Sequence, residues 1–189
     1  MTAPASAPAG LLAVIDMQHV FADPDSPWAV PRFADAAAGV RRLLPAFTGR
    51  TVFTRFLAPA LPTGAWRAYY ARWPFALQPP DAPLWRLAGD FADLAGPTLD
   101  TETFGKWTPG LVARLGPGEP LVLAGVSTEC CVLTTALAAA DAGTEVLVVA
   151  DACAGVDDRA HRETLRLLEL YGPLVRVVTT GDLGARDLP

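Results

Sequence analysis

The chain has 189 residues, of which 51% are hydrophobic and 19% charged, a size and composition typical of one folded domain. No apolar run approaches the roughly 18 residues that cross a bilayer. With 15 Lys and Arg against 20 Asp and Glu, and no dense basic cluster, the sequence argues against a nucleic-acid or membrane partner. We therefore expect a small-molecule partner.

The N-terminal segment MTAPASAPAG lacks the positive start and the apolar centre of a secretory signal. We expect a disordered tail over residues 1–10, a single domain over 11–189 and a cytoplasmic protein. The cysteines, Cys130, Cys131 and Cys153, are odd in number, and two are adjacent, where a disulfide would be strained. Reduced thiols are expected.

Short apolar runs rich in β-branched residues predict strands at 11–16, 51–55, 120–125, 145–150 and 174–178. These runs do not alternate with polar residues, so both faces of the sheet should be covered. Apolar residues at helical spacing lie between them, within 33–44, 132–140 and 160–171. Strands that alternate with helices predict right-handed βαβ units, and hence an α/β fold of three αβα layers around a parallel, Rossmann-like sheet.

Residues 56–100 break this rhythm with a segment rich in proline and aromatic residues. Long segments of this kind typically cover a binding site or form a subunit contact. Trp66 and Tyr70 lie there at near-helical spacing. We consider both as candidate substrate contacts, with core or dimer packing as the alternative.

Functional side chains in an open parallel sheet gather at the carboxyl ends of its strands. Asp16 ends the first predicted strand, and GVSTECC follows the strand at 120–125. A helix N-terminus lowers the pKa of a cysteine and offers N–H groups to an oxyanion. A nearby carboxylate can take the thiol proton and return it to a leaving nitrogen. The pattern predicts a nucleophilic thiol, and because consecutive helical residues point about 100° apart, only one of Cys130 and Cys131 can face Asp16.

Three motifs resemble those of the isochorismatase-like cysteine hydrolases, a family that includes nicotinamidases and N-carbamoylsarcosine amidohydrolases. They are LLAVIDMQHVF at 11–21, GVSTECCVLTTALAAADAG at 125–143 and VLVVADACAG at 146–155. The resemblance covers the chain after residue 10. It implies that Cys131, the cysteine immediately before valine, is the nucleophile, that Asp16 shuttles protons, and that the Val126–Ser127 peptide is cis. The N–H groups of Ser127 and Cys131 would then bind the oxyanion.

The family also carries a catalytic lysine, in a segment similar to LDTETFGKWTPGL at 99–111. Alignment on Asp100 and Phe104 places Thr101 at the lysine position. Lys106, the only lysine of the chain, is therefore our candidate for this role. A site with an arginine, or with no cation, is the alternative.

Nicotinamidases have metal-binding histidines after the second strand, where this sequence reads TRFLAP, and its only histidines are His19 and His161. We therefore expect no metal and no other cofactor, and we disfavour a nicotinamidase. Arg55 ends the second strand, where it is a candidate to bind a substrate carboxylate, with a local ion pair as the alternative. Phe21 is a further candidate substrate contact.

These features predict an enzyme that hydrolyses a C–N bond in a small amide, imide, ureido or carbamoyl compound through a thioester acyl-enzyme. Similar proteins form homodimers or homotetramers, and we expect the same here. Vinyl-ether hydrolysis, the reaction of true isochorismatases, does not require the cysteine. Two further alternatives are a catalytically silent scaffold or ligand-binding protein, and a thiol-redox protein that uses Cys130 and Cys131.

Overall fold

A computed structural model describes residues 10–184, which contain a parallel sheet of six strands in the order β3-β2-β1-β4-β5-β6. This is the order of a doubly wound, Rossmann-like sheet, as predicted. The strands are β1 (Leu11–Ile15), β2 (Thr51–Phe56), β3 (Leu99–Thr101), β4 (Leu121–Val126), β5 (Val146–Ala154) and β6 (Val175–Val178).

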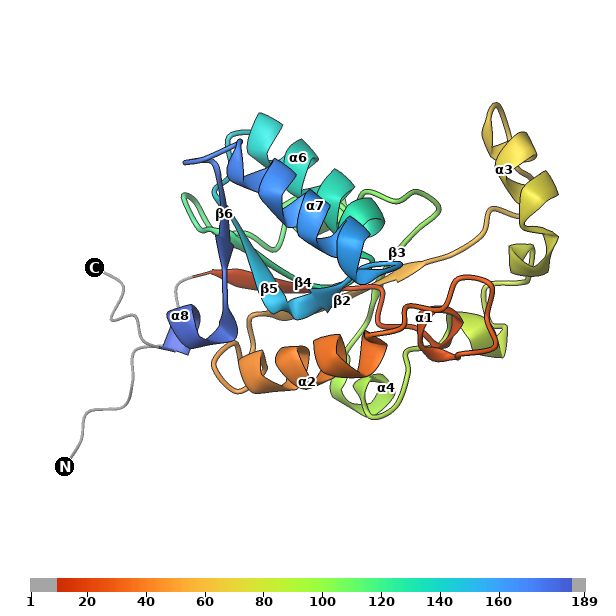
Figure 1. The fold of residues 1–189 in the computed structure, drawn as a ribbon, viewed down its shortest axis with the longest axis horizontal. Helices are drawn as coiled ribbons and strands as arrows, with labels where there is room; N and C mark the ends of the chain where they lie inside the picture. The colour runs from red at the N-terminus through yellow and green to blue at the C-terminus, as the bar shows by residue number, and fades with distance from the viewer. Residues whose placement is uncertain (1–9, 185–189) are drawn as a thin grey trace.

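Helices cover both faces of this sheet (Figure 1). The helices α2 (Phe33–Leu43) and α8 (Thr180–Gly184) lie on one face, and α6 (Leu133–Asp141) and α7 (Asp158–Glu169) lie on the other. The arrangement confirms the predicted αβα layers. The shorter elements are α1 (His19–Ala22), α3 (Trp66–Arg72), α4 (Phe91–Leu94), α5 (Pro109–Val112), the 3₁₀ turns η1 (Pro74–Ala76) and η2 (Pro83–Trp85), and a π-helical turn, η3 (Thr128–Val132).

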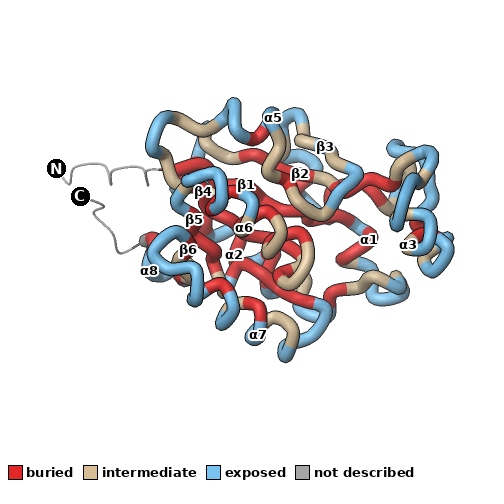
Figure 2. The backbone as a smooth tube through the Cα atoms, turned by 90° about the horizontal axis from the view of Figure 1, so that it is seen from above, coloured by how far each residue is buried: buried red, intermediate tan, exposed pale blue. Residues whose placement is uncertain are grey.

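The central strands β1 and β4 are buried along their whole length, as Figure 2 shows. In β1, Leu12 and Val14 pack on the α2 side, whereas Leu11, Ala13 and Ile15 pack on the α6 side. Successive strand residues point to opposite faces, so a strand covered on both sides must be apolar throughout. This explains the unbroken apolar runs of the sequence.

The edge strand β3 was not among the predicted strands. It has three residues, Leu99, Asp100 and Thr101, none of which is fully buried. A short strand at the edge of a sheet needs no apolar run, so the sequence carries no signal for it. It adds a strand to the sheet beside β2.

The predicted tail over residues 1–10 lies outside the described residues except for Gly10. Residues 185–189 of the predicted domain lie outside them as well. No helix within 10–184 has both the length and the apolar character needed to span a membrane.

Helix α2 approaches β5 closely at Gly39. A Cβ atom at this position would lie 2.3 Å from the carbonyl oxygen of Asp151 and 2.5 Å from the Cα atom of Ala152. Both are backbone atoms of β5, a strand paired on both sides in the sheet, and they cannot move aside as a flexible side chain can. The packing of α2 on the sheet therefore requires glycine here.

We predict that Gly39→Ala lowers the free energy of unfolding by about 2 kcal/mol, because overpacking outweighs the higher helix propensity of alanine. Urea unfolding followed by circular dichroism measures the change. Gly96→Ala is the control, since no heavy atom lies within 4 Å of a Cβ there, and its effect should stay within about 0.5 kcal/mol. Equal midpoints for Gly39→Ala and wild type would contradict the packing described here.

Candidate active site

The carboxyl ends of β1 and β4 meet at the centre of the sheet. Ile15 pairs with Gly125, so Asp16 and the segment after β4 leave the sheet side by side. Gly125 has φ +117°, and a Cβ atom there would lie 2.1 Å from the carbonyl oxygen of Ile15. Only glycine permits this approach, which brings the two motifs together.

Asp16 is fully buried and adopts a left-handed backbone conformation with φ 48°. Aspartate tolerates this region better than most residues. The hydroxyl group of Thr54 donates a hydrogen bond to Asp16 Oδ1 over 2.7 Å, and Lys106 Nζ lies 2.9 Å from Oδ2. Both carboxylate oxygens are therefore engaged, and the orientation of the side chain is defined.

Lys106 is 1% exposed and forms three polar contacts through its ammonium group. Besides the ion pair with Asp16, Nζ donates hydrogen bonds to Thr101 Oγ1 over 2.8 Å and to the carbonyl oxygen of Thr103 over 3.0 Å. Two hydrogen bonds and one ion pair thus surround the ammonium group. Lys106 therefore reaches Asp16 from the segment after β3, and Thr101, at the aligned lysine position, accepts one of its hydrogen bonds.

Thr135 of α6 links the lysine segment to the cysteine turn. Its hydroxyl group accepts a hydrogen bond from the Lys106 N–H over 2.9 Å and donates one to the Cys131 carbonyl oxygen over 2.6 Å. Thr135 is itself fully buried. The positions of Lys106 and Cys131 are thus coupled through one side chain.

Both adjacent cysteines lie in the π-helical turn η3 that precedes α6. The N–H of Val132 donates to the carbonyl oxygen of Ser127, five residues earlier, over 3.2 Å. We predicted an ordinary helix start, and the wider turn found here is the kind often seen at functional sites. Cys131 is 3% exposed, whereas Cys130 is half-buried.

The pKa of the Cys131 thiol is raised well above its usual value. The causes are a hydrogen bond with Cys130, then burial, then the negative charge of Asp16, while Lys106 acts in the opposite direction. The expectation of a lowered pKa is therefore wrong for the resting site, because these effects oppose the helix entrance. The thiol rests protonated and needs a base before it can attack.

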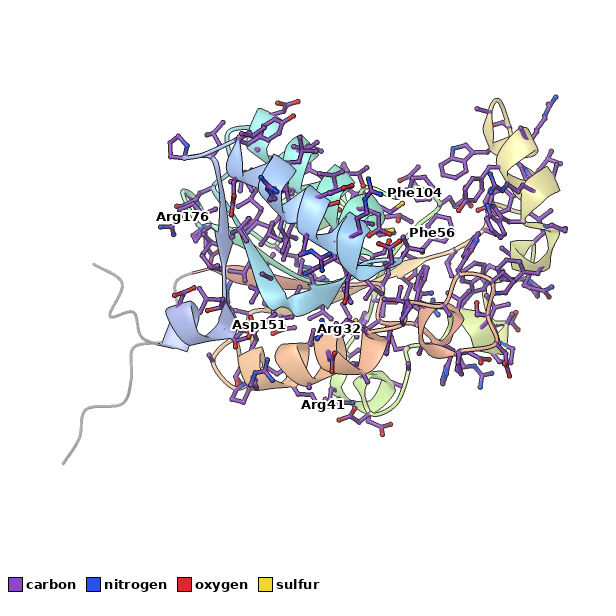
Figure 3. All side chains as sticks on the ribbon, viewed as in Figure 1. Arg32, Arg41, Phe56, Phe104, Asp151 and Arg176 are labelled. Carbon is purple, nitrogen blue, oxygen red and sulfur yellow. The ribbon has the colours of Figure 1, made fainter. Side chains whose placement is uncertain are left out.

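The Val126–Ser127 peptide bond is cis, as the family resemblance implied. Ser127 and Cys131 both line a cavity of about 220 Å³ at this edge of the sheet. Its other lining residues are Phe21, Pro27, Trp28, Val30, Phe56, Tyr69, Trp73, Phe104, Glu129, Cys130 and Val156. Figure 3 places Phe56 and Phe104 at the end of the sheet that faces α3. We call this cavity the aromatic pocket.

Of the predicted substrate contacts, Phe21 lines the aromatic pocket, but Trp66 and Tyr70 do not. Tyr70 is 1% exposed and sits in the core, and Trp66 packs on Phe104 with 5.0 Å between ring centroids. Neither residue lines this pocket, because α3 turns a different face, that of Tyr69 and the adjoining Trp73, toward it.

The role predicted for Arg55 in binding a substrate carboxylate is also not supported. Arg55 donates hydrogen bonds of 2.9 and 2.5 Å to the two carboxylate oxygens of Asp100, its neighbour on β3. It is not among the residues that line the aromatic pocket. The local ion pair, the alternative interpretation, is what the structure contains.

Trp28, which no sequence pattern predicted as a site residue, lies at the centre of the aromatic cluster. Its ring centroid is within 6.3 Å of those of Phe21, Phe56, Tyr69 and Trp73. Trp28 lies in the irregular loop between α1 and α2, seven residues after Phe21, so its aromatic character was the one signal in the sequence.

Within residues 10–184, no three His, Cys, Asp or Glu side chains are grouped as metal ligands. The ring of His161 instead shares a hydrogen bond of 2.8 Å with the hydroxyl group of Thr128. His19 is exposed.

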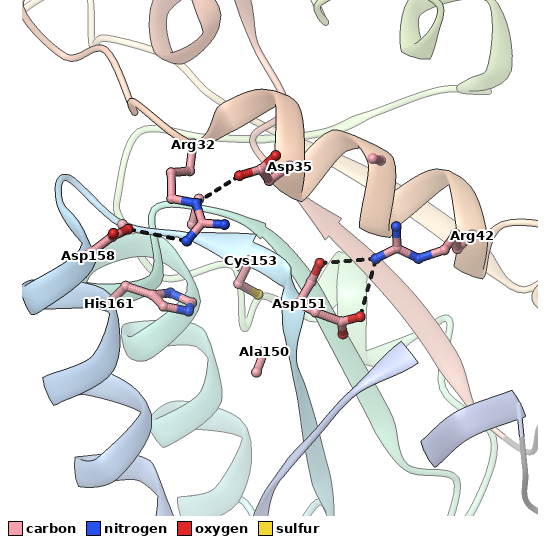
Figure 4. Close-up of a pocket in the computed structure, with 11 residues that line it drawn as sticks. Arg32, Asp35, Arg42, Ala150, Asp151, Cys153, Asp158 and His161 are labelled. Atoms are coloured by element: carbon pink, nitrogen blue, oxygen red, sulfur yellow. Dashed lines mark hydrogen bonds and ion pairs between the residues drawn. The ribbon is translucent and has the colours of Figure 1, made fainter. Parts of the chain in front are cut away.

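A second cavity, of about 500 Å³, lies between α2, β5 and α7 (Figure 4). Its arginines are already paired: Arg32 with Asp35 and Asp158, and Arg42 with Asp151. Cys153 lies here rather than in the aromatic pocket, and burial raises the pKa of its thiol to about 12. These features are those of a core cysteine beside a network of ion pairs.

Comparison with known proteins agrees with this geometry. The model of the isochorismatase domain family matches residues 10–182. Similar solved structures include a cysteine hydrolase from Pseudomonas syringae pv. phaseolicola, with 20% identity, a TM-score of 0.78 and coverage of 96% of this chain and 93% of that one. An isochorismatase family protein from Desulfovibrio vulgaris has 20% identity, a TM-score of 0.78 and coverage of 94% and 99%.

A nicotinamidase from Bacillus subtilis has 19% identity, a TM-score of 0.72 and coverage of 90% of this chain and 99% of that one. No curated protein matches the sequence. At these identities the structural likeness establishes the fold, and the match of the family model over nearly the whole described chain establishes the family. The chain therefore belongs to the isochorismatase family of hydrolases, as its motifs predicted.

Proposed function

We propose that this protein hydrolyses the C–N bond of a small amide, imide or carbamoyl compound, with Cys131 as the nucleophile. The observation that supports this best is the buried contact between Lys106 and Asp16, 2.9 Å apart, next to a thiol whose pKa their charges influence. Nucleophile, base and cation thus lie together beside a pocket that admits a small molecule.

In the first half of the reaction, the Cys131 sulfur bonds to the substrate carbonyl carbon while Asp16 accepts the thiol proton. Because the thiol rests protonated, this transfer accompanies the attack. The N–H groups of Ser127 and Cys131 hold the negative charge on the carbonyl oxygen. The C–N bond then breaks, and the proton on Asp16 passes to the leaving nitrogen.

In the second half, water attacks the thioester. Asp16 accepts a proton from the water and returns it to the Cys131 sulfur as the C–S bond breaks. The enzyme regains its starting state, and one amide and one water become one acid and one amine or ammonia.

Lys106 has two roles in the proposed site: it stabilises the charged form of Asp16, and it lowers the net negative charge beside the thiol. Its ammonium group compensates the carboxylate, which would otherwise be an isolated buried charge. It also opposes the effect of Asp16 on the thiol, which favours the thiolate as it forms.

The silent-scaffold alternative loses its main argument, the missing lysine at position 101, because Lys106 contacts Asp16. A thiol-redox role rests on the adjacency of two free cysteines, Cys130 and Cys131, and the experiments below distinguish it from hydrolysis. The homo-oligomer, the cytoplasmic location and the lack of nucleic-acid and membrane partners stay predictions.

Replacing the nucleophile tests the proposal directly. We predict that Cys131→Ala lowers kcat/KM by about 10³-fold or more, measured as ammonia release from a panel of small amides and carbamoyl compounds. Cys153→Ala is the control and keeps its activity, because this thiol faces the second cavity. Activity that survives in Cys131→Ala would remove the proposed mechanism.

The ion pair can be tested through stability. We predict that Lys106→Met lowers the free energy of unfolding by about 3–5 kcal/mol, because the Asp16 carboxylate is left buried without its counter-charge. The double variant Asp16→Asn/Lys106→Met regains part of this loss but remains inactive. Urea unfolding of the two variants is compared. If Lys106→Met is as stable as wild type, the pair does not exist in solution.

The raised pKa of Cys131 predicts how the thiol reacts with iodoacetamide. At pH 7 alkylation is slow, and the rate keeps rising with pH beyond the roughly 8.5 of a free thiol. Asp16→Asn removes a charge that raises this pKa, so the variant alkylates faster at pH 7 although it does not hydrolyse amides. Mass spectrometry identifies the modified cysteine. A wild-type rate that levels off below pH 7 would indicate a lowered pKa instead.

The same pKa has a consequence for stability. Because the folded state favours the protonated Cys131 thiol, this preference adds to the free energy of unfolding. The added stability is complete below the pKa of this thiol in the unfolded chain, roughly 8.5, and is lost as the pH rises through the higher pKa of the folded state. The difference in free energy of unfolding between wild type and Cys131→Ala, measured by urea unfolding, should therefore shrink as the pH rises above roughly 8.5.

A further inference from the structure

Six aromatic side chains surround the aromatic pocket. They are Phe21, Trp28, Phe56, Tyr69, Trp73 and Phe104. They come from the segment after β1, the end of β2, the region of α3 and the loop before Lys106, and so from four separate parts of the chain. Neighbouring rings contact one another, for example Phe56 and Phe104 with 5.9 Å between centroids. The pocket wall is thus a continuous aromatic surface.

One lining residue carries a formal charge, and that residue is Glu129. Its Oε1 accepts a hydrogen bond from the Val156 N–H over 3.1 Å, and Oε2 lies buried against Gly155, without a hydrogen-bond partner among the described residues, so Glu129 acts on the pocket through its charge. Behind the pocket, the charges of Asp16 and Lys106 compensate each other. The pocket therefore has a net negative charge.

An aromatic wall and a carboxylate attract the same kind of ligand group. The faces of Trp, Tyr and Phe rings are electron-rich and bind ammonium groups, and several rings together bind quaternary ammonium ions. A buried carboxylate oxygen without a partner is costly, and a cation offsets that cost. We infer that the substrate carries a cationic ammonium group beside its scissile amide, an inference that rests on the proposed function and names its substrate class.

Other substrate charges fit this pocket less well. An anionic substrate would meet Glu129 without a compensating cation, since Arg55 is bound to Asp100 and Lys106 to Asp16. A neutral substrate would contact the aromatic wall but gain nothing from the negative charge of Glu129.

The position of Glu129 also limits the distance between the two substrate groups. Glu129 and Cys131 lie two residues apart on the turn η3, and the cavity measures about 220 Å³. This is smaller than the pockets that hold drug-sized ligands. The cation and the reacting carbonyl group should therefore be separated by one or two carbon atoms.

Three amides of similar size test the inference. Trimethylammonioacetamide is cationic, 3,3-dimethylbutanamide is its neutral isostere, and succinamate is anionic. We expect kcat/KM for the cationic amide to exceed that for the neutral isostere by about tenfold or more, with succinamate slowest. Equal or faster hydrolysis of the neutral isostere would overturn the inference and leave the proposed function intact.

Matched variants test the residues. In Glu129→Gln the cationic-to-neutral ratio of kcat/KM should fall by about tenfold, and Trp28→Leu should lower it as well. Glu163→Gln removes an exposed carboxylate on α7 and should keep the ratio of the wild type. If the cationic-to-neutral ratio of kcat/KM is unchanged in both Glu129→Gln and Trp28→Leu, the aromatic pocket does not bind the cationic group.

Binding separates this inference from the catalytic proposal. Quenching of tryptophan fluorescence in Cys131→Ala measures affinity for the same amides without turnover. Tighter binding of the cationic amide than of its neutral isostere supports the inference, whether or not wild type hydrolyses either amide. If wild type hydrolyses neither amide, that failure of hydrolysis counts against the proposed function and not against the inference. Equal binding of the two, or no binding, would overturn the inference.

Discussion

The buried ion pair of Asp16 and Lys106 is the interaction on which the site depends. Asp16 follows the central strand β1, and Lys106 lies in the segment after the edge strand β3. The ion pair therefore joins two chain segments that leave the sheet two strands apart. Two charges removed from water are tolerated only with good geometry and further hydrogen bonds, which Thr54 and Thr101 supply. The pair thereby holds in place the loop that contributes Phe104 to the pocket wall.

The turn η3 carries the proposed nucleophile, Cys131, and the one charged residue of the pocket wall, Glu129, two residues apart. The charges of Asp16 and Lys106 act on the Cys131 thiol in opposite directions, and Glu129 on the same turn lines the aromatic pocket. Wide helical turns present side chains in directions that a regular helix does not. Thr135 restrains this turn through the Cys131 carbonyl oxygen, and the Val156 N–H restrains it through Glu129. The two residues that we propose to contact the substrate are therefore held by one ordered turn.

Local patterns in the sequence were sufficient for the layers and for the meeting of Asp16 with the cysteine turn. Continuous apolar runs predicted the buried strands, and strand ends predicted that Asp16 and the adjacent cysteines lie together, whereas the choice of Cys131 over Cys130 came from the family resemblance. The approach of Lys106 follows from loop geometry that has no periodic pattern. Arg55 was misassigned because its counter-ion lies on a strand too short to predict. Aromatic residues occupy two faces of α3, and only tertiary packing decides which face the pocket receives.

Thr101 stands where the family lysine aligns, and its hydroxyl group contacts the ammonium group that arrives from position 106. A survey that scores one alignment column for lysine would discard chains of this kind as defective. The property worth screening is spatial: any basic side chain in that loop long enough to touch the aspartate. A search that uses this spatial criterion would keep homologues that a search for lysine at one aligned position discards.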